Sequence, residues 1–148
     1  CSAFLETGEI GAKGRSKLNA VIPVAEAELE KTILQAGAAK APRLTPPDID
    51  ACIVREHYFT AAQGAHAVLL QETGVALFTP EMATGPLSRL TFCVLTLRNG
   101  FTVTGESACA SPENFNAEIG VRIARENARE KIWMLEGYLL RERLNAAQ

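Results

Sequence analysis

Two β-rich segments flank an Asn-Gly pair in RLTFCVLTLRNGFTVTGES (residues 89–107), and this pattern constrains the fold more than any other. Asn and Gly best tolerate the positive φ angles that both central residues of a type I′ turn require. The sequence therefore predicts an antiparallel hairpin with Asn99 and Gly100 at its tip and Thr96 opposite Val103.

In this register both faces of the hairpin are largely apolar. One face would carry Leu90, Phe92, Val94, Phe101 and Val103. The other would carry Cys93, Leu95 and Leu97 with Thr102 and Thr104. Neither face suits full exposure to water in so small a chain, so we expect a partner subunit to cover part of the sheet.

Helix signals lie on both sides of the hairpin. Thr45 is a suitable N-cap, prolines follow it, and Asp48 is three residues further on, which predicts a helix over Pro46–His57. After the hairpin, Ser-Pro-Glu at residues 111–113 resembles a second cap, and a helical pattern runs over Asn116–Arg143.

At about 100° per residue, the long helix presents one broad apolar arc. Its members are Ile119, Ile123, Ala124, Ala128, Ile132, Leu135, Tyr138 and Leu139. A narrow stripe outside the arc holds Arg122, Arg125, Arg129, Trp133 and Glu136. We expect the arc to pack on the sheet, and the arginines to be available either to solvent or to a ligand.

The remaining segments carry weaker signals. HAVLLQETGVALF could form an edge hairpin around Thr73-Gly74, followed by a loop. PVAEAELEKTILQAGAA (residues 23–39) predicts one modest amphipathic helix within an extension, residues 1–43, that is poor in aromatic side chains. We therefore expect an α+β domain over residues 44–148: a small antiparallel sheet centred on the hairpin, packed by the long C-terminal helix and a shorter helix.

Composition excludes several classes of function. With 15 basic and 17 acidic residues the formal charge is -2, which gives no field for binding a nucleic acid polymer. No apolar run is long enough to span a membrane, and the four scattered cysteines are typical of reduced cytosolic thiols. We read the start at Cys1 as a truncated reading frame rather than a lipoprotein.

Catalytic and metal sites are poorly supported by the residues. GESAC, with Ser107 and Cys109, resembles a hydrolase Gly-x-Ser elbow but lacks its second glycine. The two histidines, His57 and His66, have no obvious orienting partner and no metal-ligand spacing. We expect no enzyme activity, no metal and no cofactor.

A binding pocket is better supported. The helix start at Ser111, Asn114 and Asn116 would expose backbone N–H groups to an anion. Phe101 and Phe115 lie on either side of it in sequence, and we expect Ser107 to line the same pocket. Arginines that could grip phosphate follow on the same helix: Arg122, Arg125 and Arg129. The competing interpretation is a capped helix, core phenylalanines and a solvated arginine stripe paired with nearby glutamates.

The motifs NGF-x-V-x-GES-AC, SPENF, EIG and ENA-x-x-KIW-x-LEGYLL resemble a family of small tailed-phage proteins. The resemblance is dense over residues 89–144 and looser over residues 48–62. This family is identified with the first-described Thoeris anti-defence protein, a sponge that sequesters a cyclic ADP-ribose isomer without cleaving it. Some relatives hold cyclic di- or trinucleotides of the CBASS type, as dimers or as hexamers.

The resemblance implies that an aromatic residue stacks on adenine and that arginines bind phosphate. Phe101 and Phe115 match the aromatic motif positions, and Asn114 and Asn127 match the amides. We therefore expect a homo-oligomer, dimer or hexamer, that captures a small cyclic nucleotide-like signal in the host bacterial cytoplasm. Two rival hypotheses are an enzyme that degrades a cyclic nucleotide and a phage accessory or assembly module that binds other proteins.

Overall fold

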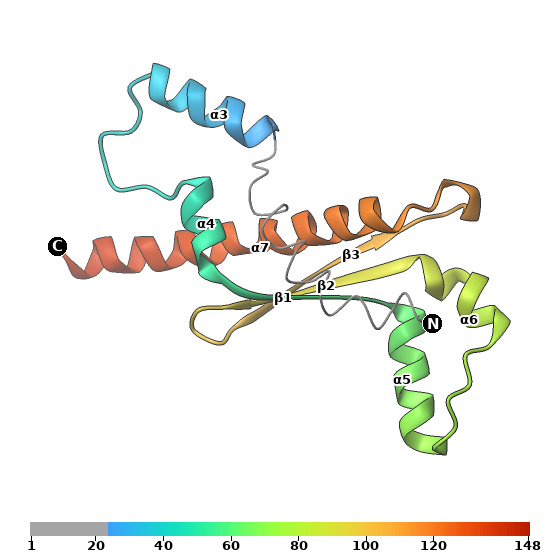
Figure 1. Cartoon of the computed structure of the whole chain (residues 1–148). Coiled ribbons are helices and arrows are strands. Elements are labelled where there is room, and N and C mark those ends of the chain that lie inside the picture. The colour runs from blue at the N-terminus through green and yellow to red at the C-terminus, as the bar shows by residue number, and fades with distance from the viewer. Residues whose placement is uncertain (1–23) are drawn as a thin grey trace.

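The computed structural model describes residues 24–148 (Figure 1). In chain order the elements are α3 (Val24–Gln35), α4 (Pro46–Cys52), β1 (Ile53–Thr60), α5 (Ala61–Thr73), α6 (Pro80–Thr84), the 3-10 turn η1 (Pro86–Arg89), β2 (Leu90–Leu97), β3 (Thr102–Ala108), the 3-10 turn η2 (Pro112–Asn114) and α7 (Ala117–Ala146). The sheet is antiparallel in the order β1-β2-β3. Because α7 lies across one face of it, the α+β prediction is confirmed.

The hairpin forms where the sequence predicts it, but its loop is longer. The Leu97 N–H donates to the Phe101 carbonyl at 2.8 Å, and the Gly100 N–H donates to the Leu97 carbonyl at 2.9 Å. Gly100 has φ 86°, whereas no described residue other than glycine has a positive φ. The loop therefore holds Arg98, Asn99 and Gly100, and the two-residue type I′ prediction is wrong.

This extra loop residue reverses the predicted faces of β3. Val103 pairs with Leu95 rather than Thr96, so it lies on the same face as Cys93 and Leu97. A one-residue change of register moves a strand's side chains to the opposite face. The face beneath α7 is the buried one, and the outer face keeps Phe92 and the other outward β2 residues half-buried.

The helix predicted over Pro46–His57 ends at Cys52, and the rest of that segment is β1. Its start is as predicted, because the Asp48 carboxylate accepts from the Thr45 N–H at 2.8 Å and the Thr45 hydroxyl at 2.7 Å. The residues that follow are rich in β-branched and aromatic side chains, and they pair along β2 with one irregularity between Ile53 and Arg55. Strand pairing therefore prevails over continuation of a short helix.

The first strand of the predicted edge hairpin around Thr73-Gly74 is instead part of helix α5, and the second, residues 75–78, is irregular. The Thr60 hydroxyl accepts from the Gln63 N–H at 3.2 Å, and the Gln63 side chain accepts from the Thr60 N–H at 2.7 Å. Gly74 ends the helix in the left-handed region, with φ 70°. A left-handed glycine suits both a hairpin turn and a helix C-terminus, which explains the wrong prediction.

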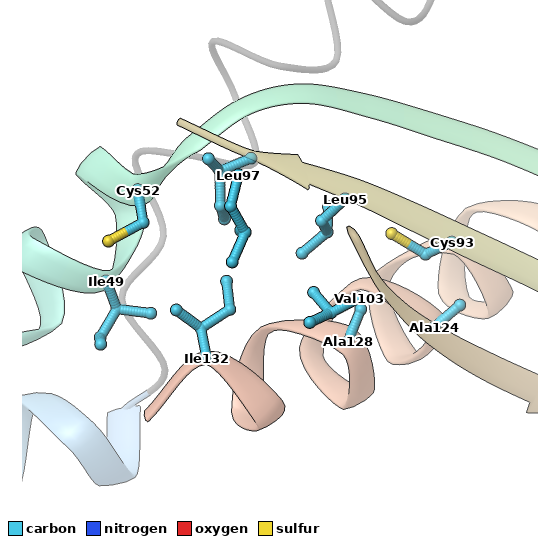
Figure 2. Close-up of a cluster of buried hydrophobic side chains, with 10 residues drawn as sticks. Ile49, Cys52, Cys93, Leu95, Leu97, Val103, Ala124, Ala128 and Ile132 are labelled. Carbon is cyan, nitrogen blue, oxygen red and sulfur yellow. The ribbon is translucent and has the colours of Figure 1, made fainter. Parts of the chain in front are cut away.

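The core lies between the sheet, α4 and α7 (Figure 2). Its residues are Ile49, Cys52, Ile53, Cys93, Leu95, Leu97, Val103, Ala124, Ala128 and Ile132. A Cβ on Gly105 would collide with the backbone of Ala124 and Ala128. The glycine therefore lets α7 lie directly against β3.

The length of α7 agrees with the prediction, but its orientation differs. Ile119, Ile123 and Tyr138 were expected in the core, yet they are 54%, 46% and 67% exposed. Arg125 and Arg129 were placed on the polar stripe, and both are buried. The predicted apolar arc is therefore only partly the face that packs on the sheet.

Candidate ligand-binding site

Arg125 is held inside the protomer by an acidic partner from β1. Its guanidinium donates to Glu56 Oε1 at 3.0 Å, and both side chains are 2% exposed. The Tyr58 hydroxyl donates to the second Glu56 oxygen at 2.6 Å. Burial acts to lower the pKa of Arg125, but Glu56, together with Tyr58 and Asp50, raises it above its usual value. Arg125 is therefore engaged in a structural ion pair.

Arg129, one turn further along α7, is equally buried. Its Nε donates to Asp50 Oδ1 at 2.8 Å, and its Nη1 donates to Glu26 Oε1 at 2.6 Å. Its Nη2 donates to the Pro46 carbonyl at 3.3 Å. Burial opposes the charge, but the Asp50 and Glu26 carboxylates raise the pKa of Arg129 above its usual value. The guanidinium thus joins α7 to α4 and α3.

The other polar residues of the predicted pocket are scattered. Asn127 donates to the Glu106 carbonyl at 2.8 Å, so its amide binds the edge of β3. Arg122 and Asn114 are exposed, on α7 and η2 respectively. Ser107 is half-buried on β3, where it pairs with Thr91 of β2.

The two predicted aromatic residues lie near different parts of α7. Phe101 is at the hairpin tip and lines a groove with Met134. Phe115 lies beside Gly120, where its ring would be 4.0 Å from a Cβ added to the glycine. Gly120 and Met134 are separated by about 20 Å along the helix at 1.5 Å per residue. Within one protomer, the structure does not bring the predicted pocket residues together.

An open groove of about 400 Å³ lies between the hairpin tip and the C-terminal half of α7. Its lining residues are Leu97, Asn99, Phe101, Met134, Leu135, Glu136, Tyr138 and Leu139. Phe101 is 55% exposed and Tyr138 is 67% exposed, so each can offer part of an aromatic surface. Beside the groove, the Arg98 guanidinium bonds Glu136 Oε2 at 3.0 Å while the Arg98 side chain stays 48% exposed.

Of the predicted site residues only Phe101 lines this groove. The sequence reasoning missed Met134 and Tyr138, which have the four-residue spacing of neighbours on a helix face. Tyr138 was expected in the apolar arc that packs on the sheet, and Met134 was assigned to neither face. The position of the hairpin tip along α7, which decides whether they are covered, depends on contacts between distant segments.

Two of the described cysteines, Cys52 and Cys93, lie in the core, whereas Cys109 is half-buried and its thiol donates to the Ser111 carbonyl at 3.2 Å. Burial raises the pKa of the Cys52 thiol to about 11 and that of Cys93 to about 12, so both stay protonated near neutral pH. His57 is exposed on β1, and the His66 ring packs edge-on against Phe78 with centroids 5.2 Å apart. Across residues 24–148, no three His, Cys, Asp or Glu side chains are grouped to bind a metal ion.

The fold and groove define a small α+β protein with an open apolar depression beside a long helix. The chain belongs to the phage protein (N4 Gp49/phage Sf6 gene 66) family, whose model matches residues 44–144. The resemblance to phage proteins is confirmed at this level. No curated protein and no solved structure matches the chain. Among the described helices, none has the length and apolar character needed to cross a membrane.

Proposed function

We propose that this phage protein is an anti-defence sponge that binds a small cyclic nucleotide-like signal in the host bacterial cytoplasm and withholds it without cleavage. A Thoeris cyclic ADP-ribose isomer is the first candidate, and CBASS cyclic di- or trinucleotides are the next. The observation that carries the proposal is the groove at the hairpin tip. Its volume of about 400 Å³ falls within the range typical of small-molecule sites.

The groove offers contacts suited to a nucleotide. Phe101 and Tyr138 lie on its hairpin wall and its helix wall. Stacking of a base on an aromatic side chain contributes about 1–3 kcal/mol. The partly exposed Arg98 guanidinium beside the groove supplies a positive charge for a phosphate.

A second copy of the chain, packed over the open groove, would bury more of the ligand, which tight binding requires. A scarce signal demands a Kd near ~1 nM, equivalent to about 12 kcal/mol, and an open groove buries too little of a ligand for that. Exposed apolar side chains beside the groove and elsewhere on α7 favour self-association: Ile119, Ile123, Met134 and Leu139. We therefore include a homo-oligomer, dimer or hexamer, in the proposal.

Capture rather than conversion is supported by the groove lining. Among the described residues that line it, Glu136 is the one carboxylate, and it is paired with Arg98. Neither histidine and none of the described cysteines lines the groove. General acid–base or nucleophilic chemistry needs such groups within hydrogen-bond reach of the ligand.

The test is a thermal-shift screen with cyclic ADP-ribose isomers, cyclic dinucleotides and cyclic trinucleotides. We expect one class to raise the Tm of the wild-type protein, and Phe101→Ala and Tyr138→Ala to reduce the affinity by about 1–3 kcal/mol. Phe78→Ala is the matched control, because Phe78 is also an exposed aromatic residue but lies outside the groove.

The fate of the bound ligand separates the sponge from an enzyme. Heating the complex should release the ligand chemically intact, whereas a degradative enzyme would release fragments. If no member of the panel raises the Tm, the proposal is wrong. The exposed apolar residues of α7 would then favour a protein-interaction module.

A further inference from the structure

The helix α3 lies outside the segment that the family model matches, yet one of its side chains reaches the interior of the domain. Glu26 Oε1 accepts from Arg129 Nη1 at 2.6 Å and from Trp133 Nε1 at 3.2 Å. Arg129 and Trp133 are four residues apart, on one face of α7. Two N–H donors of the domain therefore converge on a single carboxylate oxygen.

The fit of Glu26 to this pair of donors is incomplete. Glu26 Oε2 is buried and has no hydrogen-bond partner. A buried acceptor without a partner lacks the hydrogen bonds it would make in water. The two N–H donors thus suit an anion, but only one of the two Glu26 carboxylate oxygens accepts hydrogen bonds from them.

Arg129 does not depend on Glu26 for its orientation. Asp50 binds its Nε at 2.8 Å, and the Pro46 carbonyl accepts from Nη2 at 3.3 Å. These partners leave Nη1 directed toward Glu26. When Glu26 departs, the guanidinium and the indole N–H therefore remain as a preformed pair of donors, although Asp50 offsets part of the positive charge.

The helix α3 is held loosely. It contains no buried residue, and Val24, Leu29 and Leu34 are 75%, 59% and 61% exposed. Its other ion pair, from Glu30 to Arg43, stays within the N-terminal segment and does not reach α7. Among the hydrogen bonds of the described residues, only those of Glu26 connect α3 to α7.

We propose that Arg129 and Trp133 form an anion seat for a phosphate group, and that Glu26 is its built-in competitor. The helix α3 then acts as a strap, occupying the seat when no phosphate is present and yielding it to a ligand. This site is distinct from the groove, whose lining includes neither Arg129 nor Trp133. The proposal therefore does not depend on the sponge function.

The chain contains one tryptophan, so intrinsic fluorescence reports directly on Trp133. The experiment titrates the full-length protein with inorganic phosphate and, separately, with adenosine 5′-monophosphate, against sodium chloride at equal ionic strength. Glu26→Ala removes the competitor, whereas Glu26→Gln keeps an acceptor oxygen for both donors. Glu28→Ala is the matched control, because Glu28 is an exposed glutamate on the same helix.

We expect Glu26→Ala to bind inorganic phosphate at least ~5-fold more tightly than the wild-type protein, because removal of an internal occupant raises the fraction of competent seats. Glu26→Gln should lie between them, and Glu28→Ala should match the wild type. A stronger response to the nucleotide than to inorganic phosphate would assign the seat to a phosphorylated ligand rather than free phosphate. Phe78→Ala should leave every one of these titrations unchanged, because Phe78 belongs neither to the seat nor to the groove lining.

Two results would overturn the proposal. One is a Glu26→Ala variant that shows no saturable change in Trp133 emission with phosphate, or no tighter binding than the wild type. The other is loss of the folded circular-dichroism spectrum in Glu26→Ala, because the proposal requires the domain to stay folded when Glu26 no longer binds Arg129 and Trp133. A failed groove ligand screen with a positive phosphate titration would reject the sponge alone.

Discussion

The two flanks of α7 contrast sharply in what they bury. On one flank, Arg125 and Arg129 are 2% exposed and are held by carboxylates from β1, α4 and α3. On the other, Met134 and Tyr138 are 76% and 67% exposed beside the hairpin tip. Hydropathy alone would predict that the two arginines are exposed and that the methionine and tyrosine are buried.

The contrast shows that burial on this helix follows its neighbours rather than its own side chains. A guanidinium can be buried where carboxylates meet it and satisfy its donors. A methionine or tyrosine stays exposed where the sheet ends and nothing in the described part of the protomer covers it. The charged flank therefore joins α7 to β1, α4 and α3 within the protomer, whereas the apolar flank leaves its side chains exposed.

The largest effect should come from breaking the charged flank. Arg125→Ala would leave Glu56 buried without its guanidinium, and we expect a loss of about 3–5 kcal/mol in the free energy of unfolding. Urea denaturation measures this loss. Arg122→Ala, an exposed arginine on the same helix, is the control and should change stability by about 0.5 kcal/mol or less.

Replacing both partners sharpens the same test. The double variant Arg125→Met with Glu56→Gln removes both charges, and it should recover most of the stability lost in Arg125→Ala. If Arg125→Ala is as stable as Arg122→Ala, the buried pair contributes little, and the comparison between the flanks fails.

A smaller loss should follow from separating α7 from the sheet. Gly105→Ala places a methyl group against the α7 backbone, and we expect a cost on the order of 2–3 kcal/mol. Gly137→Ala is the matched control, because a methyl group added there would meet no neighbouring atom within 4 Å. It should stabilise the helix by about 0.5–1 kcal/mol. Equal shifts in Tm for the two variants would contradict the close approach of α7 to β3.

Local signals in the sequence were sufficient for much of the fold. Asn99-Gly100 located the hairpin, Thr45 and Asp48 located the start of α4, and the long helical pattern located α7. Each is a short-range preference that one segment carries by itself. The exact loop length was not such a preference, because Asn-Gly serves both two-residue and three-residue hairpins.

The strand β1 and the orientation of α7 could not be predicted because they depend on distant partners. β1 is a strand because β2, more than thirty residues later, pairs with it. Arg125 is buried because Glu56 lies 69 residues away in sequence yet bonds to it. The candidate groove also depends on distant segments, because the hairpin and the C-terminal half of α7 form it together. Of its lining residues, only Phe101 was predicted to bind a ligand.

Two polar side chains of α7 bind the outer edge of β3, and one of them, Asn127, was also predicted to bind the ligand. Asn127 and Lys131 donate to the Glu106 and Thr104 carbonyls. Such contacts cover the free edge of a strand that could otherwise pair with another chain. We expect Asn127→Ala to lower stability by about 1 kcal/mol and leave ligand affinity unchanged. A lower affinity with unchanged stability would return Asn127 to the binding site.

The smallest change in stability should come from the apolar flank. Phe101→Ala and Tyr138→Ala each remove a side chain that is more than half exposed, so we expect unfolding free energies within about 0.5 kcal/mol of the wild type. The measurement is made at low protein concentration, where self-association does not contribute, and repeated at high concentration. If the groove lies at a subunit boundary, the wild-type Tm should rise with concentration more steeply than that of either variant. A loss of about 2 kcal/mol or more at low concentration would mean that these aromatic residues belong to the core of the protomer, and the distinction between the two flanks of α7 would disappear.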